Sequence, residues 1–550
     1  MERRDESLTT ASEPSVGDVE MPVSGQEGLR EASRAHVTER VELVIGIVAP
    51  LGTDVGPTLI QLAQSLHSVG YTSRTIRLSQ LLDDVDQGDP LPQVGEPNYL
   101  ERRMTAGDQL RERFGSGGAL AALCISNIWA DRESVVGTPD GLGAESELSP
   151  RNEHATILRS LKHPDEVQLL RQVYGERFIL IGVNAPEPDR RRRLIDQLLE
   201  ESHAFARDEV AAKAEELLRR DSKDPHNDYG QNVRKTFEEA DVFVHTGTGD
   251  KNEAADRFIR LLFGDPFVTP ERDEMAMAMA RVAGLRSSSA GRQVGAAIAD
   301  KHGEILAVGT NEVPKPGGGQ YWPKDDPDDR DFHQEFDPND QLARRVLSDI
   351  LDRLRDVGWL KDEISDMSWA ERISRALEDD EGDPAVPAGL VRARVLNLIE
   401  FGRIVHAELA ALMTCARRGN AVSGCTLYTT TFPCHECARH IIGAGIKRVV
   451  YISPYPKSLV REMFERSIGV DAGADGENVV VFEHYVGISP TNYDRYFVAG
   501  KRKDRKTGRI VRWDARSSAP RLGRLTPSGE IFDREAEVLG AAADVLRSSG

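Results

Sequence analysis

The sequence predicts an α/β protein with an N-terminal parallel-sheet domain and a C-terminal three-layer α/β/α domain. The chain has 550 residues, whereas a single hydrophobic core stops growing near ~250–300 residues. Short runs rich in Val and Ile alternate with helical patterns, as they do in α/β proteins. We therefore expect an arm at residues 1–40, domains at 41–265 and 266–500, and a terminal segment at 501–550.

The N-terminal arm and the first structural unit differ sharply in composition. Residues 1–40 are polar and acidic without periodicity, so we expect a disordered arm. Residues 41–48 form a β-branched run that predicts a buried parallel strand. A glycine-containing turn at 49–57 and an apolar helical pattern at 59–66 follow. The domain thus opens with a strand, a turn and a helix.

The turn after this strand is a candidate nucleotide-binding site. Such a turn can hold phosphate on backbone N–H groups at a helix N-terminus, as P-loop proteins do. The candidate residues are Gly52, Thr53, Asp54 and Gly56. No lysine occurs between Gly46 and Thr58, so the turn lacks the residue that contacts the transferred phosphate. The sequence favours nucleotide sensing or a purely structural turn over kinase activity.

Three further apolar runs complete the predicted N-terminal sheet. They lie at residues 120–126, 178–183 and 240–245. Arginine-rich stretches at 190–193 and 219–221 are similar to the arginine-bearing segments of nucleotide kinases, and equally fit solvated helix faces. A predicted helix at 253–263 ends before Gly-Asp-Pro at 264–266, which marks the domain boundary.

The second domain is predicted to surround one sheet with helices. In chain order we expect a helix at 270–283, a hairpin with strands from 293 and at 304–311, a helix beginning just before 406, a strand at 426–430, a helix at the Cys-x-x-Cys segment and a strand at 448–453.

Two segments of the second half carry no clear chemistry. The acidic insert at 323–384 contains a helical run at 342–354, and is a lid or an oligomer contact. A basic stretch at 501–506 is interpreted as a solvated strand or, alternatively, a phosphate or RNA contact, and 533–546 as a short helix.

Four side chains between 406 and 437 form the candidate catalytic centre. His406, Cys434 and Cys437 supply the imidazole and two thiolates of a catalytic zinc site, which keeps a fourth position open. The two cysteines lie three apart at the expected start of a helix, so both sulfurs can face one point. Glu408 is then left for proton transfer, and the order H-x-E followed by P-C-x-x-C is that of zinc deaminases. A structural zinc site would need a fourth ligand, which no second paired motif supplies.

From about residue 275 to 496 the chain resembles the cytidine and deoxycytidylate deaminase superfamily, on the deoxycytidylate branch. The matching segments are RS at 286–287, RQVGA at 292–296, GTNEVP at 309–314, HAE at 406–408 and TFPCHEC at 431–437. The turn without lysine, the segment GGGQYW at 317–322 and the acidic insert are similar to bacterial anti-phage dCTP deaminases.

This resemblance implies a Zn²⁺ cofactor and hydrolytic deamination of free deoxycytidine nucleotides, dCTP or dCMP, which would deplete that pool during phage infection. It implies Asn311 as a sugar contact, although a turn residue is the alternative. It places Arg286, Arg292 and Lys457 near the 5′-phosphates, although each fits a solvated or stacked residue equally. It also suggests a multimer.

Charge separates the remaining function classes. A net charge of −20 argues against a long nucleic-acid track and favours a free nucleotide in a local positive pocket. A polynucleotide deaminase is the first alternative, against which this charge and the aromatic content of 6% both count. The second alternative is a regulatory protein whose N-terminal domain senses a nucleotide or a small RNA.

Composition also sets the expected compartment. No apolar run approaches the ~18 residues of a membrane span. The N-terminus lacks an apolar segment, and five cysteines are too few for a disulfide framework. We therefore expect a cytoplasmic protein that contacts no membrane.

Overall fold

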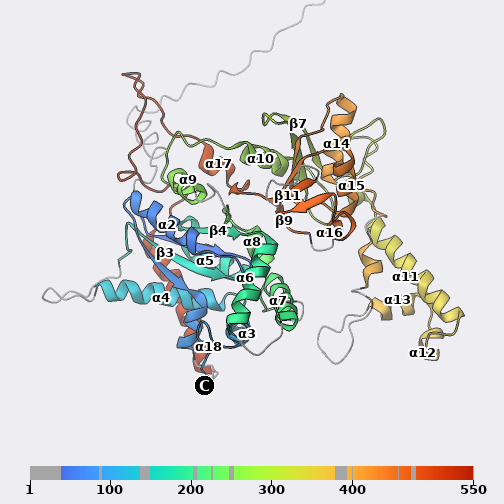
Figure 1. Ribbon diagram of the computed structural model, residues 1–550, viewed down its shortest axis with the longest axis horizontal. Helices are drawn as coiled ribbons and strands as arrows, with labels where there is room; N and C mark the ends of the chain where they lie inside the picture. Colours follow the sequence, from blue (N-terminus) through green and yellow to red (C-terminus); the bar gives the residue numbers. More distant parts are fainter. Residues whose placement is uncertain are drawn as a thin grey trace, which may run out of the picture.

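The computed structural model shows two α/β units, each built on a six-stranded sheet (Figure 1). The described residues are 39–85, 90–136, 149–201, 207–224, 227–246, 253–377, 390, 393–398, 401–455, 458–471 and 479–548. The predicted arm at 1–40 lies almost wholly outside them. The mixed α/β fold class predicted from the sequence is confirmed.

The N-terminal sheet is parallel except at one edge. Its strands are β1 (Leu43–Val48), β2 (Thr72–Arg77), β3 (His154–Leu161), β4 (Phe178–Asn184), β5 (Val242–His245) and β12 (Gly487–Ile488). They lie in the order β12-β5-β4-β1-β3-β2. Ile45 of β1 lies opposite Ile157 of β3 and Ile179 of β4 in parallel register. The strands predicted at 41–48, 178–183 and 240–245 are confirmed.

Helices cover both faces of this sheet, so β1 is buried along its whole length. Val44 and Val48 belong to one core cluster, and Leu43 and Ile45 belong to the other. The helices, including two short 3₁₀ segments, are α2 (Gly56–Ser68), η1 (Leu78–Asp84), α3 (Tyr99–Phe114), α4 (Ala119–Val136), α5 (Pro164–Tyr174), η2 (Gly175–Arg177), α6 (Glu187–Glu201), α7 (Arg207–Ser222), α8 (Val233–Glu238) and α9 (Glu253–Leu262).

The strand predicted at 120–126 is wrong, because these residues form the buried first half of α4. Its alanine-rich start favours a helix. A short apolar run buried on all sides has the same pattern in a helix and in a central strand. Cys124 and Ile125 are fully buried in the core that β1 and β4 share with α4. The sheet position is taken instead by β3, which the sequence analysis did not predict.

The C-terminal sheet lies between two helical layers. Its strands are β6 (Gly295–Ala299), β7 (Ile305–Thr310), β8 (Thr426–Thr431), β9 (Arg448–Ser453), β10 (Ile468–Val470) and β11 (Val480–His484). The order is β10-β11-β9-β8-β6-β7, in which β6 pairs antiparallel with β7 and β8 and the other pairs are parallel.

Helix α10 (Arg272–Gly284) covers one face of this sheet, and α14 (Ala407–Arg418) and α15 (His435–Gly443) cover the other. Alternate residues of β6 show this division: Ala297 packs with α10, whereas Ala296 and Ile298 pack with α14 and α15. The remaining short elements are η4 (Asp331–His333), η6 (Arg394–Asn397), α16 (Val460–Met463) and α17 (Tyr493–Phe497). The predicted three-layer arrangement is therefore observed.

The described part of the acidic insert forms a helical arm that projects from the C-terminal unit (Figure 1). Its helices are α11 (Pro338–Asp356), α12 (Asp362–Ser365) and α13 (Trp369–Leu377). The helical run predicted at 342–354 lies within α11. Leu347, Leu351 and Ile373 form a small core of their own, so the arm packs mainly on itself.

The end of the chain returns to the N-terminal unit. Strand β12 pairs antiparallel with β5, and α18 (Ser528–Ser548) packs against α4 and α5. Arg132 of α4 joins Glu42 at 3.0 Å and Glu535 of α18 at 2.5 Å, and all three side chains are buried. Removing one partner from such a buried group leaves an uncompensated charge, so α18 is firmly fixed. The helix predicted at 533–546 is confirmed and longer.

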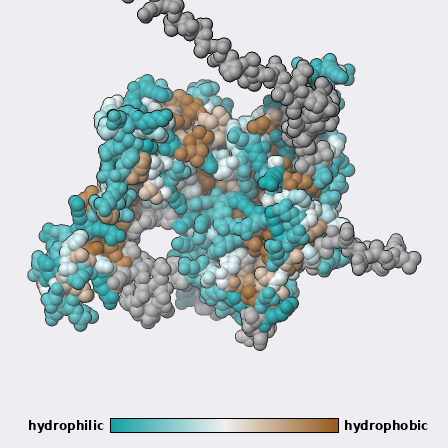
Figure 2. Space-filling view, turned by 180° about the vertical axis from the view of Figure 1, so that it is seen from behind, coloured by the Kyte–Doolittle hydropathy of each residue, from teal (hydrophilic) through white to brown (hydrophobic). Residues whose placement is uncertain are grey.

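The basic stretch at 501–506 is a turn, so the strand predicted there is wrong. Asp504 accepts hydrogen bonds from the backbone of Lys506 and Thr507 and pairs with Lys501 at 3.3 Å. A single bridge between Lys503 and Ile510 closes the turn. The face seen in Figure 2 is mostly hydrophilic, with apolar side chains in small patches. Among the described helices, none is both long and apolar enough to span a bilayer.

Candidate active site

The candidate metal ligands lie at the N-termini of two neighbouring helices. His406 is the N-cap residue of α14, and Cys434 is the N-cap residue of α15, which follows β8. Helix α14 lies directly on β7, where a Cβ at Gly309 would be 2.1 Å from the Ala407 carbonyl oxygen. Only glycine permits that approach. The His-x-Glu and Cys-x-x-Cys segments are therefore held side by side by the sheet.

The three predicted ligand side chains converge. His406 Nδ1 lies 3.2 Å from Cys434 Sγ and 3.5 Å from Cys437 Sγ, and the ligand atoms all lie within 4.8 Å of one another. Tetrahedral Zn²⁺ with ordinary Zn–N and Zn–S bonds would separate nitrogen from sulfur by about 3.6 Å. The residues present fit one zinc ion. Among the described residues no other group of three His, Cys, Asp or Glu side chains is placed this way.

The electrostatics of the cluster favour metal binding. The hydrogen bond from the Cys437 thiol, with a further one from His406, lowers the pKa of Cys434 to about 4. The Cys437 N–H, at the helix N-terminus, also lies 3.4 Å from Cys434 Sγ. Cys434 raises the pKa of His406 to about 9. Without a cation the protons are thus shared within the cluster, and a metal ion would replace them.

Glu408 lies beside these ligands and is not needed as one. Its carboxylate is 4% exposed, and its Oε2 lies 3.6 Å from Cys437 Sγ. Burial raises the pKa of this carboxyl group to about 7. A buried carboxyl group in contact with the ligand set can accept and return a proton without leaving the site. The structure therefore brings together all four side chains that the sequence singled out.

Asn311 braces the segment that carries Arg292. Its Oδ1 accepts the Val294 N–H at 2.8 Å, and its Nδ2 donates to the Arg292 carbonyl oxygen at 2.8 Å. The Ser287 hydroxyl donates to the Asn311 carbonyl at 2.8 Å. Asn311 thus has a positioning role in the protein, and its predicted contact with a sugar stays a prediction.

The basic residues predicted near the phosphates are differently placed. Arg286 stacks on Trp322, 4.0 Å from the ring centroid, and donates to the Tyr321 carbonyl at 3.1 Å. Burial lowers the pKa of Arg286, and its Nη2 already donates to Gln320 and Tyr321. Arg292 is exposed and faces Glu238 of α8 at 3.9 Å. Lys457 lies outside the described residues. The phosphate contacts of all three residues stay predictions.

The N-terminal turn is braced from within. Gly52 has a φ of +83°, and a Cβ there would lie 2.4 Å from the Arg190 carbonyl oxygen. The Gly56 N–H donates to Asp54 Oδ1 at 3.1 Å, and the other carboxylate oxygen pairs with Arg193 at 2.7 Å. A carboxylate of the chain therefore occupies the helix N-terminus that phosphate would use. Nucleotide binding by residues 52–56 stays a prediction, and it requires Asp54 to move.

Sequence reasoning missed the contribution of the N-terminal unit to this region. Helix α8 contacts β9, and its Glu238 faces Arg292. Tyr455, two residues after the end of β9, lies close enough to Cys434 and Arg292 for both to affect its pKa. No motif marks α8, because its role depends on how the two units pack. Ser458, in contrast, directly follows Lys457, which the sequence analysis singled out, and its hydroxyl donates to the Pro433 carbonyl at 2.8 Å.

Comparison with known proteins agrees with this geometry. Residues 270–453 match the profile of the cytidine and deoxycytidylate deaminase zinc-binding region. A deaminase domain of this type in the C-terminal part of the chain is therefore supported. Deoxycytidylate deaminase of Enterobacteria phage T4 is 44% identical over 54 residues, which is 10% of this chain and 28% of that protein. ComE operon protein 2 of Bacillus subtilis (strain 168) is 36% identical over 100 residues, 18% of this chain and 49% of that protein.

In both relatives the matched region is less than half of the protein. Among solved structures, dCMP deaminase from the cyanophage S-TIM5, in complex with dCMP and dUMP, is similar at 19% identity. The match covers 39% of this chain and 98% of that chain, with a TM-score of 0.21. The family profile and the relatives, together with the ligand geometry, carry the assignment of the zinc region.

Proposed function

We propose that the protein is a zinc-dependent hydrolase that deaminates free deoxycytidine nucleotides, converting dCTP, dCMP or both to the uracil nucleotide and ammonia. One observation carries this proposal. His406, Cys434 and Cys437 present their ligand atoms within 4.8 Å of one another, with the buried Glu408 carboxylate 3.6 Å from Cys437 Sγ. Three ligands plus a free carboxylate is the arrangement of a catalytic zinc site, not of a closed structural one.

His406, Cys434 and Cys437 would hold the ion, which supplies Lewis-acid activation of water at neutral pH. Glu408 Oε2 takes one proton from the attacking water as its oxygen bonds to C4 of the cytosine ring. The carboxyl group gives that proton to the ring nitrogen beside C4. It then takes the remaining proton from the new hydroxyl group on C4 and gives it to the 4-amino group, so that the C–N bond breaks, a C4 carbonyl forms and ammonia leaves. One buried carboxyl group thereby acts as base and then as acid.

The preference for a free nucleotide is supported by charge and by the surroundings of the site. A net charge of −20 disfavours a long polyanion. Glu238 of the N-terminal unit faces Arg292 across the domain junction. The N-terminal unit therefore lies beside the zinc region, where a bound polynucleotide would need open surface. A single nucleotide needs only a local pocket.

We further propose that this deamination serves antiviral defence by depleting the deoxycytidine nucleotide pool. The support is the resemblance of the turn without lysine, the segment at 317–322 and the acidic insert to bacterial anti-phage dCTP deaminases. Cells expressing the protein should lose dCTP during phage infection, and cells expressing Glu408→Gln should not. Equal dCTP loss in both strains would contradict this role.

The reaction is tested by supplying dCTP, dCMP, CTP and a cytosine-containing oligonucleotide to the purified protein and measuring ammonia. We expect ammonia from at least one deoxycytidine nucleotide and none from the oligonucleotide. Turnover of the oligonucleotide alone would replace the proposal with a polynucleotide deaminase. No turnover of any substrate by zinc-loaded protein would favour a regulatory protein.

A further inference from the structure

A cavity of about 440 Å³ lies between the two units. We call it the interdomain pocket, and its size is within the range of small-molecule sites. Six of its lining residues matter for the argument: Asn184, Arg219 and Arg234 from the N-terminal unit, and Tyr455, Ser458 and His484 from the C-terminal unit. Figure 1 shows α8, which carries Arg234, at the junction near β9.

The pocket lies at the carboxyl ends of strands from both sheets. Asn184 is the last residue of β4, and Tyr455 lies two residues after the end of β9. Ligands of open parallel α/β sheets bind beyond the carboxyl ends of the strands, where loops diverge and backbone groups remain available. Here two such edges face one cavity, so the position favours a ligand on topology alone.

The pocket contains cationic and donor groups without protein partners. Neither Arg219 nor Arg234 has a carboxylate within 4.0 Å among the described residues, and the nearest charge effect is that of Arg234 on Glu238 of the same helix. Asn184 is 4% exposed, and its Nδ2 has no hydrogen-bond acceptor among the described residues. A buried donor left unpaired is costly, about 1–3 kcal/mol. Two free guanidinium groups and a free amide donor together select an oxygen-rich anion.

Of the four acidic side chains that line the pocket, three are paired within the protein, and burial raises the pKa of the fourth, Asp471, to about 6. Glu187 pairs with Arg461 at 2.5 Å. Asp221 pairs with Lys162 at 2.7 Å and accepts the Leu51 N–H at 2.7 Å. Glu215 pairs with Arg191 on the outer side of α6. These pairs leave the guanidinium groups of Arg219 and Arg234 available to a ligand.

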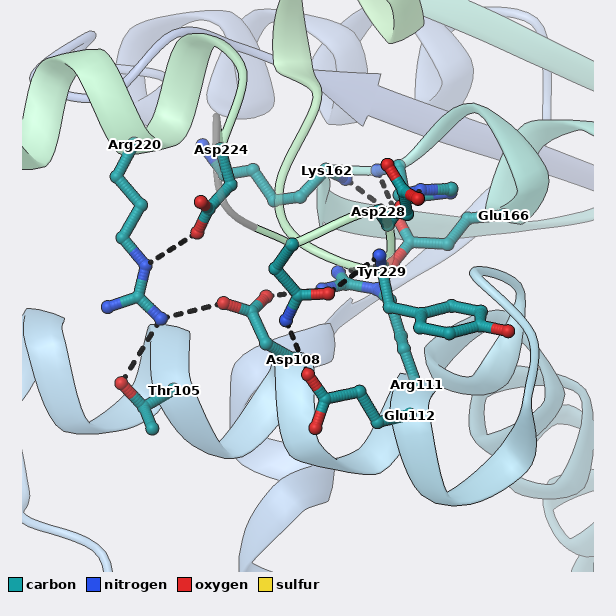
Figure 3. Close-up of polar contacts among 12 residues, drawn as sticks. Thr105, Asp108, Arg111, Glu112, Lys162, Glu166, Arg220, Asp224, Asp228 and Tyr229 are labelled. Carbon is teal, nitrogen blue, oxygen red and sulfur yellow. Dashed lines mark hydrogen bonds and ion pairs between the residues drawn. The ribbon is translucent and has the colours of Figure 1, made fainter. Parts of the chain in front are cut away.

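A polar network fixes the end of α7, the helix that carries Arg219 (Figure 3). Arg220, next to Arg219 on α7, donates to Asp108 of α3 at 2.7 Å and to Thr105 at 3.1 Å. Arg111 extends the network from Asp108 to Glu166 at 2.8 Å. The end of α7 is therefore anchored through Arg220, which leaves Arg219 to the pocket. Preorganised donors of this kind lose little entropy when a ligand binds.

The pocket continues toward the zinc centre. Ser458 lines it and donates to the carbonyl of Pro433, the residue before the ligand Cys434. Tyr455 lines it and lies near both Cys434 and Arg292. A nucleotide with its base at the zinc centre could therefore extend its 5′ end past Tyr455 toward α7 and α8.

We propose that the interdomain pocket binds the 5′-phosphate chain of the nucleotide that is deaminated, with Arg219, Arg234 and Asn184 as its ligands. This inference rests on the proposed function and deepens it. The N-terminal unit then selects for phosphate number: the distal phosphates of dCTP reach Arg219 and Arg234, the single phosphate of dCMP does so less, and deoxycytidine not at all.

The test compares Arg219→Gln and Arg234→Gln in the full-length, zinc-loaded protein. Lys235→Gln is the matched control, because this substitution removes the same charge from an exposed position of α8. Charge-assisted hydrogen bonds predict a KM for dCTP that rises about 10- to 100-fold in each arginine variant. The KM for dCMP should rise less, and kcat and the KM for deoxycytidine should stay within about twofold. Arg234→Lys should recover part of the loss.

Calorimetric titration with the products dUTP, dUMP and deoxyuridine gives a readout that needs no turnover. We expect one dUTP per chain, bound more tightly than dUMP, and loss of that difference in Arg234→Gln. If the wild type binds dUTP in this way but deaminates nothing, the proposed reaction fails and the pocket assignment stands.

Three results would overturn the assignment. The first is an unchanged KM for dCTP in both arginine variants, equal to that of Lys235→Gln. The second is a KM for deoxycytidine that rises as much as the KM for dCTP. The third is a second dUTP per chain that the arginine substitutions abolish, which would make the pocket a separate nucleotide site. Equal zinc content and melting temperature across the variants establish that each one is folded.

Discussion

The zinc centre and the interdomain pocket differ in how the chain builds them. The zinc centre takes its four side chains from positions 406–437, at the N-termini of two helices on one sheet face. The interdomain pocket takes its lining from positions as distant as Pro50 and His484. The zinc centre is built from two short motifs that neighbouring helices of one unit bring together. The interdomain pocket forms only when both units are packed against each other. Substitutions in the two regions should therefore fail in different ways.

Cys434→Ala should have the largest effect, because it removes a thiolate that no neighbouring residue replaces. We expect loss of bound zinc and a fall in activity of at least about 1,000-fold. Metal analysis per chain and the ammonia assay measure the two effects. Cys425→Ala is the matched control, since Cys425 is also a buried free cysteine and should keep its zinc. A Cys434→Ala protein with full zinc content would contradict the ligand assignment.

Glu408→Gln should come next and should separate chemistry from metal binding. The amide cannot accept and return a proton, so kcat should fall about 10²- to 10⁴-fold while zinc remains bound. Glu436→Gln is the control on the neighbouring helix α15, because the Glu436 carboxylate forms an ion pair with Arg439 rather than with a ligand atom. A normal rate in Glu408→Gln would rule out Glu408 as the proton carrier.

His484→Phe tests how strongly burial at the interdomain pocket affects the titration of His484, which lines that pocket. Burial, with Arg190, His245 and Arg461 nearby, lowers the pKa of His484 from 6.5 to about 3. Below pH 6.5 the unfolded chain binds a proton that the folded chain does not, so the free energy of unfolding decreases as the pH falls. The decrease should be roughly 2 kcal/mol between pH 6.5 and pH 5.

Urea unfolding of wild type and His484→Phe at pH 7, 6 and 5 measures this contribution. Phenylalanine keeps the ring contact with Tyr451, whose centroid lies 4.3 Å from that of His484, but it does not titrate. We expect a smaller loss of stability on acidification in the variant. Identical pH dependence in the two proteins would show that His484 titrates normally.

Asp54→Ala should have the smallest effect, because it changes a turn that is remote from the reaction. It removes the cap of the Gly56 N–H and a half-exposed ion pair with Arg193. The expected loss is about 1 kcal/mol of unfolding free energy, with kcat unchanged. Asp84→Ala, an acidic residue at the end of η1, is the control. A large fall in kcat for Asp54→Ala would give the turn a direct role.

Much of the zinc centre could be predicted from the sequence because its chemistry is local. The spacing of Cys434 and Cys437 and their place before a helix were enough to predict that both sulfurs meet His406, and the geometry confirms it. The strands at 41–48 and 178–183 were equally predictable, because a β-branched run buried on both faces has few alternatives.

The features that sequence reasoning missed depend on distant contacts or ambiguous patterns. The run at 120–126 has the same pattern as a buried strand, and only packing shows that it is α4. Strand β2 was missed because it is a largely exposed edge strand with polar residues. Strand β12 has only two residues, and no local sequence pattern predicts that it pairs with β5. Arg219 equally fitted a solvated helix face, and no sequence pattern singled out Arg234, because the interdomain pocket forms only where the second unit lies beside both residues.

X-ray absorption at the zinc edge of the purified, metal-loaded protein tests the central claim most directly. The claim is that His406, Cys434 and Cys437 bind one zinc ion and leave a position open. The spectrum should then show two sulfur ligands at about 2.3 Å and light-atom ligands from one imidazole and one solvent oxygen at about 2.0 Å. A spectrum of four protein ligands, or protein that binds no zinc, would contradict it.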